Sequence, residues 1–413
     1  MLGSDPGRVP GGVSLDNWQA APYLHWSFQN VAELLPTATI SRGTGPVAVL
    51  ATSSSTLGEI VVADPPEGHH RHWLWPRREA HARTVADVMA ETATDGWIVW
   101  HDGTVLAEEY LGGMEPSTLH ILMSVSKSLV GSVAGVLAAS GLLDVDAPLT
   151  AYVPALGSSG YAGATVRHLL DMRTGIDFSE DYLDPDAEVR VLEEAIGWAS
   201  QRRDGLPSTM YDYLLTLQAS GPHGGPFDYK SCETDVLGWV LEAASGARMP
   251  ELMSEVLWSR IGAEFDANIG LDTVGTGMFD GGISAALRDL VRYGALLVGE
   301  GVSLTGAQVL TPAWVADCFA GGPDSREAFA ASPSAGPMPG GMYRNQYWIP
   351  SSDPDVLLCL GIHGQMVYVN RRTRVVGAKL SSWPTPQDAG KLYSTLHAFD
   401  AVSDTPSPTS SAP

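Results

Sequence analysis

Short apolar runs typical of β-strands lie near both ends of the chain. In the first, alternating residues 97–100 lead into Asp102-Gly103 and then into residues 104–107. In the second, residues 366–369 are followed by a polar turn at 370–372 and by another apolar run at 375–380. A turn of this kind between two such runs is a strong hairpin signal. The pattern therefore predicts one β-hairpin toward each end.

Between these hairpins the spacing of apolar residues changes to that of helices. Residues 124–140 form the clearest case, and Gly141 is a suitable stop. The apolar side of this helix consists of Leu129, Val133, Val136 and Leu137. Residues 286–298 and 388–402 predict two more helices, and residues 146–275 indicate helical pieces interrupted by Gly- and Pro-rich loops.

Strands at both ends with helices between them indicate an α+β fold with one antiparallel sheet built from both ends of the chain. We expect an N-terminal arm (1–45), a sheet domain flanked by helices (46–145 and 276–402), an inserted, mainly helical domain (146–275) and a disordered tail (403–413). A binding site would lie at the seam between the two domains.

Composition and charge narrow the functional classes. The 413 residues, 44% of them hydrophobic, suffice for a large core. A net charge of −23 speaks against nucleic acids and anionic membranes as partners. The chain shows neither the roughly 20 apolar residues that span a bilayer nor a signal peptide. Three widely spaced cysteines do not suggest a disulfide framework, so we expect a cytoplasmic protein.

Residues 66–83 collect histidine, arginine and tryptophan side chains, with a histidine-rich core at residues 68–72. A metal site needs ligands that converge at a structural spacing, and this segment shows no such spacing. We therefore expect a solvated loop there, with no metal and no other cofactor in the protein.

A Ser-x-x-Lys box opens the helix predicted over residues 124–140. Ser124 and Lys127 are three residues apart and therefore share one face of that helix. A serine hydroxyl becomes a good nucleophile when a base takes its proton. A lysine can act as that base when it is neutral, which burial or cationic neighbours favour. The structural alternative is a solvated lysine in a polar first turn.

Two later segments contain candidate partners for Ser124. Tyr229 ends a loop just before a helix-like stretch, where its hydroxyl can relay a proton to the leaving group. Residues 361–365 open the last hairpin, and we expect a glycine-flanked edge strand there. Its backbone N–H, assigned to Gln365, would join that of Ser124 in stabilising an oxyanion. A tyrosine in a turn and an ordinary glycine turn are the structural alternatives.

The Ser-x-x-Lys box, the later Tyr-x-Ser and the glycine-ended triplet at 362–364 resemble, in this order, the motifs of the penicillin-recognising serine hydrolases. That superfamily includes β-lactamases, DD-peptidases and related esterases. Within it, the chain is similar to the 6-aminohexanoate-dimer hydrolases, the nylon oligomer hydrolases. The stretches that carry this resemblance are 122–129, 176–182, 281–284, 361–365 and 379–384.

The resemblance implies a β-lactamase-like fold, with Ser124 as the acylated nucleophile, Lys127 as the base and Tyr229 as a second acid or base. The positions that it implies for substrate binding are Tyr182, Glu193, Asp280, Trp348, Ile362 and His363. Tyr182 matches a tyrosine that contacts the bound amide, and Glu193 matches an acidic residue that faces the ammonium group of the substrate. For Glu193 and Asp280, a surface or capping carboxylate is the structural alternative.

The chain also departs from the superfamily pattern. Penicillin-binding members carry Lys-Thr-Gly where this chain has Ile362-His363-Gly364, and many relatives have Tyr-x-Asn where this chain ends in Ser231. The missing lysine, which helps to bind a substrate carboxylate, argues against penicillins as substrates, and so does the acidic charge.

The sequence thus predicts a serine hydrolase that works through an acyl-enzyme on linear amides such as 6-aminohexanoate oligomers, with carboxylesterase activity. Two alternatives stay open: a short-chain esterase or acyltransferase without an amidase role, and a non-catalytic binding protein on the same fold. The expected partner is a small-molecule amide or ester, and a homodimer is left open.

Overall fold

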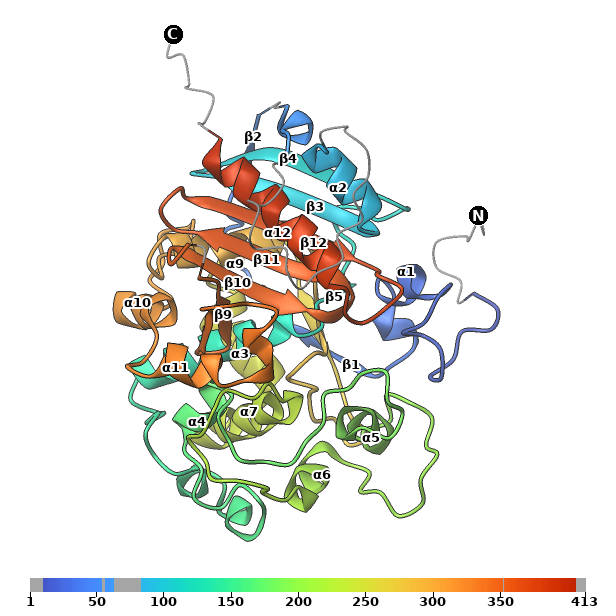
Figure 1. Cartoon of the computed structure of the whole chain (residues 1–413), viewed down its shortest axis with the longest axis vertical. Coiled ribbons are helices and arrows are strands. Elements are labelled where there is room, and N and C mark those ends of the chain that lie inside the picture. The colour runs from blue at the N-terminus through green and yellow to red at the C-terminus, as the bar shows by residue number, and fades with distance from the viewer. Residues whose placement is uncertain (1–9, 54–55, 63–82, 352, 406–413) are drawn as a thin grey trace.

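The computed structural model describes residues 10–53, 56–62, 83–351 and 353–405 (Figure 1). Within these ranges, eight strands form the main sheet in the order β2-β4-β3-β12-β11-β10-β9-β8. They are Ala51–Thr52 (β2), Thr94–His101 (β3), Thr104–Tyr110 (β4), Met342–Arg344 (β8), Tyr347–Ile349 (β9), Val356–Gly361 (β10), Gln365–Asn370 (β11) and Val375–Ser381 (β12). Strand β3 pairs with β12, so the sheet joins both ends of the chain as predicted.

Both predicted hairpins are confirmed. Strands β3 and β4 pair antiparallel around Asp102-Gly103, and β11 pairs antiparallel with β12. The expectation of an edge strand at residues 361–365 is wrong. Strand β11 lies between β10 and β12, because residues 356–361 form a further strand that pairs with it.

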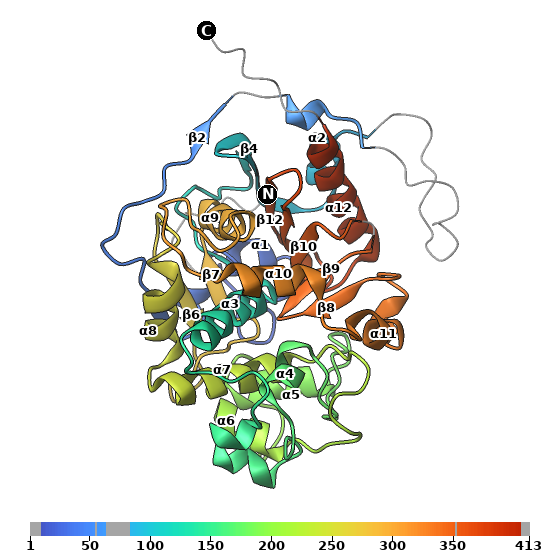
Figure 2. The same ribbon diagram turned by 90° about the vertical axis from the view of Figure 1, so that its left-hand side faces the viewer.

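The main sheet is covered by helices on both faces (Figure 2). Helices α2 (Val85–Glu91) and α12 (Ala389–Asp404) pack on one face, and α3 (Val125–Ala139) and α9 (Leu287–Val298) pack on the other. Along β3, Trp97 and Val99 face the first pair, whereas Ile98 and Trp100 face the second. Because both faces are buried, apolar residues occupy successive positions of this strand.

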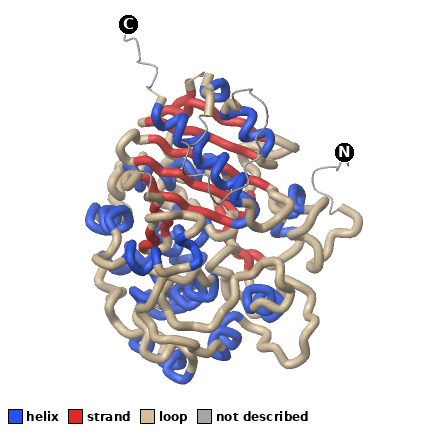
Figure 3. Tube along the Cα trace, in the orientation of Figure 1, coloured by secondary structure: helices blue, strands red, loops and turns tan. Residues whose placement is uncertain are grey.

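A mainly helical region lies beside the sheet (Figure 3). Its helices are α4 (Val166–Leu170), α5 (Glu188–Ala195), α6 (Met210–Thr216), α7 (Ser231–Ser245) and α8 (Met249–Met253). Helix α7 packs against both α3 and α4. Helices α10 (Pro312–Ala320) and α11 (Ser325–Ala330) precede β8. None of the helices in the described ranges is both long and apolar enough to span a membrane.

A second, smaller sheet was not predicted. Its strands are β1 (Thr37–Ile40), β6 (Ala267–Gly270), β7 (Ile283–Ala285) and β5 (His120–Ile121), in that order. Strand β6 falls inside the segment expected to be helical. Because β5 and β7 are antiparallel neighbours, the chain leaves β5 and enters β7 at the same end. This topology brings Ser124, shortly after β5, close to Asp280, shortly before β7.

The N-terminal arm is built into the core. Trp18 and Phe28 are buried, and the Trp18 indole donates to the carbonyl of Trp198 at 3.1 Å. Just before Phe28, helix α1 (Leu24–Ser27) carries His25, whose Nδ1 lies 2.6 Å from the Asp95 carboxylate on β3.

Two of the sequence-based expectations concern segments that the structure describes only in part. Most of the histidine-rich segment, residues 66–82, lies outside the described residues, and so does most of the expected tail, residues 406–413. Helix α12 continues to Asp404, so the first residues of that tail are helical.

Candidate active site

Ser124 lies at the N-terminal end of α3, directly after Met123, which adopts a positive φ of 46°. A non-glycine residue in this conformation is strained and persists only where its surroundings hold it. Lys127 lies one turn further along α3, and its Nζ donates to Ser124 Oγ at 2.9 Å. The serine is 8% exposed and the lysine 1%, so the hydroxyl lies nearer to the surface than the amine does.

The Lys127 amine also joins three separate segments of the chain. It donates to Ser231 Oγ at 3.1 Å and to the Asp280 main-chain oxygen at 2.9 Å, and it lies 3.4 Å from Asp280 Oδ2. Ser231 is the first residue of α7. The amine is therefore the point at which α3, α7 and the segment before β7 meet.

Two further carboxyl groups lie behind this amine. Asp235 Oδ1 accepts the N–H of Asp280 at 3.1 Å, and Glu180 accepts the N–H of Ser231. In Glu180, Asp235 and Asp280, one carboxyl oxygen each is buried and has no hydrogen-bond partner among the described residues. Burial raises the pKa of Glu180 and raises that of Asp235 well above its usual range. Burial therefore shifts both carboxyl groups toward the protonated form.

The acidic groups around Lys127 affect the pKa of its amine. Burial lowers the pKa of its amine, whereas Tyr229, when ionised, and the carboxylates of Asp280, Glu180 and Asp235 raise it. The net pKa lies above its ordinary value. The acidic surroundings therefore favour the protonated amine, whereas a base requires the neutral form. To act as a base, Lys127 must first lose its own proton.

Tyr229 lies in the loop before α7, with Lys127 Nζ 5.2 Å from its ring centroid. Burial raises the pKa of its hydroxyl, while Lys127 and a hydrogen bond with Ser124 oppose that rise. The net effect is upward, so Tyr229 is a neutral phenol that has a proton to donate. The Trp348 ring, on β9, lies against it at a centroid distance of 5.3 Å. Both side chains are partly exposed.

The turn between β10 and β11 lies against the nucleophile. A Cβ on Gly361 would lie 2.6 Å from the Leu122 main-chain oxygen and 3.1 Å from the Ser124 nitrogen. Only glycine allows this approach of the two main chains. Ile362, which follows, is partly exposed. The turn is thus suitably placed to offer a second N–H near that of Ser124.

His363 does not face a substrate, contrary to expectation. It is fully buried, its Nδ1 lies 2.7 Å from the carbonyl oxygen of Trp383, and its ring packs edge-on against Phe28. Burial lowers the pKa of this imidazole to about 4, so it is neutral at physiological pH. The N-terminal arm, which supplies Phe28, covers it.

Gln365 is buried as well, and its side chain is bonded to the main chain of Ser381 in both directions, at 2.7 and 3.0 Å. These bonds fix the first residue of β11 opposite Gly361. In the same turn, the N–H of His363 already donates to Pro386. The assignment of an oxyanion contact to the N–H of Gln365 stays a prediction.

Glu193 and Asp280 are already paired within the protein. Glu193 accepts two hydrogen bonds from the Arg190 guanidinium, at 2.8 and 3.1 Å, and one from Gln19 at 2.9 Å. Asp280 is 4% exposed and faces Lys127. An incoming ammonium group would have to share the Glu193 carboxylate with an arginine, and Asp280 lies behind the lysine. Tyr182 is partly exposed and lies on the loop that Arg190 holds.

The structure thus gathers Ser124, Lys127, Tyr229 and Asp280 in one place. Sequence reasoning assigned no role to Glu180, Asp235 or Ser231. Two of them lie in motifs that the sequence already shows: Glu180 belongs to the stretch 176–182, and Ser231 ends the Tyr-x-Ser motif. Asp235 lies four residues after Ser231, on the same face of α7.

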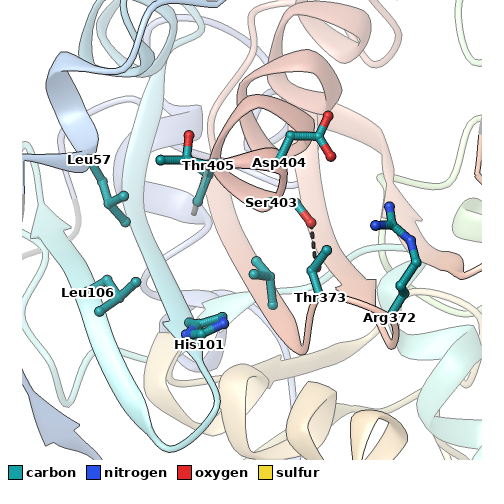
Figure 4. A pocket seen from close by; sticks show the side chains of 10 residues that line it. Leu57, His101, Leu106, Arg372, Thr373, Ser403, Asp404 and Thr405 are labelled. Carbon is teal, nitrogen blue, oxygen red and sulfur yellow. Dashed lines mark hydrogen bonds between the residues drawn. The ribbon is translucent and has the colours of Figure 1, made fainter. Parts of the chain in front are cut away.

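A separate cavity of about 280 Å³ lies at the far end of β11 and β12 (Figure 4). Its labelled lining residues include Leu57, His101, Arg372 and Thr373, and the Thr373 and Ser403 hydroxyls hydrogen-bond beside it. Gly361, which lies against Ser124, is paired with Gln365 at the opposite end of β11. The cavity therefore takes no part in chemistry at Ser124.

Comparison with known proteins gives concordant results. The Beta-lactamase family profile matches residues 81–399. A 6-aminohexanoate-dimer hydrolase of Paenarthrobacter ureafaciens is 39% identical over 414 residues, which cover 97% of this chain and 98% of that protein.

Solved structures share the fold. One is a putative 6-aminohexanoate-dimer hydrolase from Bacillus anthracis, with a TM-score of 0.82 and 25% identity over 95% of this chain and 97% of that one. Another is EstCE1, a hydrolase with promiscuous acyltransferase activity, with a TM-score of 0.58 and 17% identity over 77% and 96%. The chain therefore belongs to the β-lactamase family and is a serine hydrolase that resembles 6-aminohexanoate-dimer hydrolases.

Proposed function

We propose that this hydrolase cleaves linear amides, such as 6-aminohexanoate oligomers, through an acyl-enzyme on Ser124, and that it also cleaves carboxylic esters. The observation that carries the proposal is the 2.9 Å hydrogen bond between Lys127 Nζ and Ser124 Oγ, with the Tyr229 phenol beside both. Nucleophile, base and acid are thus in mutual reach, as covalent catalysis requires.

Acylation begins with a proton transfer away from Lys127. That proton leaves to solvent, and the Asp280 carboxylate, whose Oδ2 lies 3.4 Å away, opposes its loss because a negative charge favours the protonated amine. The neutral amine then accepts the Ser124 proton while Oγ attacks the carbonyl carbon. The N–H of Ser124 and one from the turn after Gly361 stabilise the oxyanion.

The collapse of the tetrahedral intermediate breaks the bond to the leaving group. An amine leaves poorly as an anion and needs a proton at that moment, which the neutral Tyr229 can give. Lys127 then returns the serine proton to the tyrosine. Water hydrolyses the acyl-enzyme by the same steps in reverse, so the net reaction consumes one water and yields an acid and an amine.

The surroundings of the site favour substrates without an anionic end. Glu180, Asp235 and Asp280 are acidic, and the chain carries a net charge of −23. The turn that replaces Lys-Thr-Gly holds a neutral, buried His363 and so offers no cation to a carboxylate. These features support amide or ester substrates with a neutral or ammonium end, and they count against penicillins.

The test is a substrate panel with the purified enzyme and Ser124→Ala. The panel holds a p-nitrophenyl ester, the linear 6-aminohexanoate dimer and a cephalosporin. Turnover of the dimer and the ester, lost in Ser124→Ala, supports the proposal. Ester turnover without dimer turnover selects the esterase or acyltransferase alternative, and no turnover of either selects a binding protein.

A further inference from the structure

The guanidinium of Arg190, on helix α5, contacts Tyr182 in two ways. Its Nε and Nη2 donate to the main-chain oxygen of Tyr182 at 3.1 and 2.9 Å. Its central carbon lies 5.6 Å from the centroid of the Tyr182 ring. Arg190 therefore fixes both the main chain and the ring face of this residue.

The other side of the same guanidinium is anchored by two further segments. Its Nη1 donates to Glu193 Oε2 at 2.8 Å and to Gln19 Oε1 at 3.3 Å. Gln19 belongs to the N-terminal arm and also donates to Glu193 at 2.9 Å. The arginine side chain is only 18% exposed. Arg190 thus connects the arm and α5 with the Tyr182 loop.

That loop leads directly to the catalytic lysine. Two residues before Tyr182, the Glu180 carboxylate accepts the N–H of Ser231, and the Ser231 hydroxyl accepts from Lys127 Nζ at 3.1 Å. Burial and the charge of Glu180 raise the pKa of the Tyr182 hydroxyl well above its ordinary range. A shift of Tyr182 would therefore be felt where the reaction occurs.

We propose that Arg190 is a positioning residue for the hydrolysis, which holds Tyr182 in place two residues after Glu180 through its carbonyl and its ring, while Glu193 and Gln19 hold the arginine. This inference rests on the proposed function, because the contact of Tyr182 with a bound amide is implied by family resemblance. It gives Glu193 a different role from the expected one: the carboxylate anchors Arg190.

Lysine cannot replace this arginine. The planar guanidinium bonds to the Tyr182 carbonyl and to the Glu193 carboxylate at once, whereas an ammonium group is a single point on a flexible stem. Arg190→Lys should therefore retain little more activity than Arg190→Met. Arg190→Met also removes the cation that pairs with the Glu193 carboxylate, and that carboxylate attracts an ammonium end. The loss of activity in Arg190→Met should therefore appear as a lower kcat, without a rise in KM for an amine-terminated substrate.

The experiment is a double-mutant cycle between Arg190→Met and Tyr182→Ala, measured on whichever ester or amide the wild type turns over fastest. Arg190→Met should lower kcat/KM by roughly 10- to 100-fold, the cost of a misplaced contact. In the Tyr182→Ala background, the same change should cost less than about twofold. Arg202→Met is the matched control, because the Arg202 guanidinium pairs with the adjacent Glu194 and donates to the carbonyl of Pro185.

Full additivity of the two changes, or equal losses in Arg190→Met and Arg202→Met, would overturn the inference. Fluorophosphonate labelling at Ser124 and the melting temperature are measured in every variant. An unlabelled wild type contradicts the proposed function itself. A labelled wild type with an additive cycle contradicts only the role of Arg190. If Arg190→Met merely loosens the fold, the melting temperature falls and the cycle is additive, which also counts against the inference.

Discussion

Asp280→Asn should make the enzyme work at lower pH. The change keeps the shape of the side chain and removes one negative charge 3.4 Å from Lys127 Nζ. At an effective dielectric constant of about 20, two unit charges at this distance attract by about 5 kcal/mol, equivalent to three or four pKa units. Glu180 and Asp235 keep part of the acidic environment. We therefore expect the pKa of the lysine to fall by roughly one to three units.

The assay is the pH profile of kcat/KM with a p-nitrophenyl ester, whose leaving group needs no proton. The acidic limb of that profile reports the base of the free enzyme. Removing the carboxylate lowers the pKa of Lys127, so this limb should move to lower pH in Asp280→Asn. Asp146→Asn, the same change at an exposed position, is the control and should leave the profile unchanged. An unmoved limb, or one shifted upward, would refute the electrostatic reasoning.

Three further changes have distinct expected results. Lys127→Arg should be nearly as inactive as Lys127→Ala on any substrate, because arginine keeps the charge but does not release a proton; substantial activity would reduce Lys127 to an electrostatic role. Tyr229→Phe should lose more amide than p-nitrophenyl ester activity, and equal losses would assign Tyr229 to serine activation instead. Lys379 is buried, with its pKa lowered to about 7 mainly by burial, so its charge costs stability most below pH 7 and progressively less as the pH rises toward 10.5. Lys379→Met should therefore stabilise the protein against urea at pH 6, and this gain should shrink by roughly 3 to 5 kcal/mol by pH 10; a gain independent of pH would contradict the burial argument.

The features that sequence alone predicted are those specified by local pattern. The helix after Ser124 and the two hairpins each arise from a continuous stretch, in which spacing and turn residues suffice. The small sheet escaped prediction because its strands have only two to four residues, too few for a periodicity. Its consequence, the meeting of Ser124 and Asp280, depends on pairing between distant segments.

In the candidate site, too, contacts within one segment could be predicted, and contacts between distant segments could not. Ser124 and Lys127 share one helix turn, so their contact followed from spacing. The charge of Lys127 depends on Glu180 and Asp235, which come from other segments, and local pattern could not supply it. The burial of His363 likewise depends on Phe28 in the distant arm.

The partner of Glu193, in contrast, lies nearby in the sequence. Arg190 lies three residues earlier on the same helix, a spacing at which side chains meet. The ion pair was therefore visible in the sequence. The resemblance to enzymes with an acidic residue at this position implies a contact with the substrate, which stays a prediction.

The central claim is that Ser124 becomes acylated. The most direct test mixes the enzyme with a p-nitrophenyl ester, quenches it in acid within the first turnover and measures its intact mass and its peptides by mass spectrometry. We predict a mass increase of one acyl group, located on the peptide that contains Ser124 and absent in Ser124→Ala. An acyl group on any other residue, or turnover by Ser124→Ala at the wild-type rate, would contradict the account.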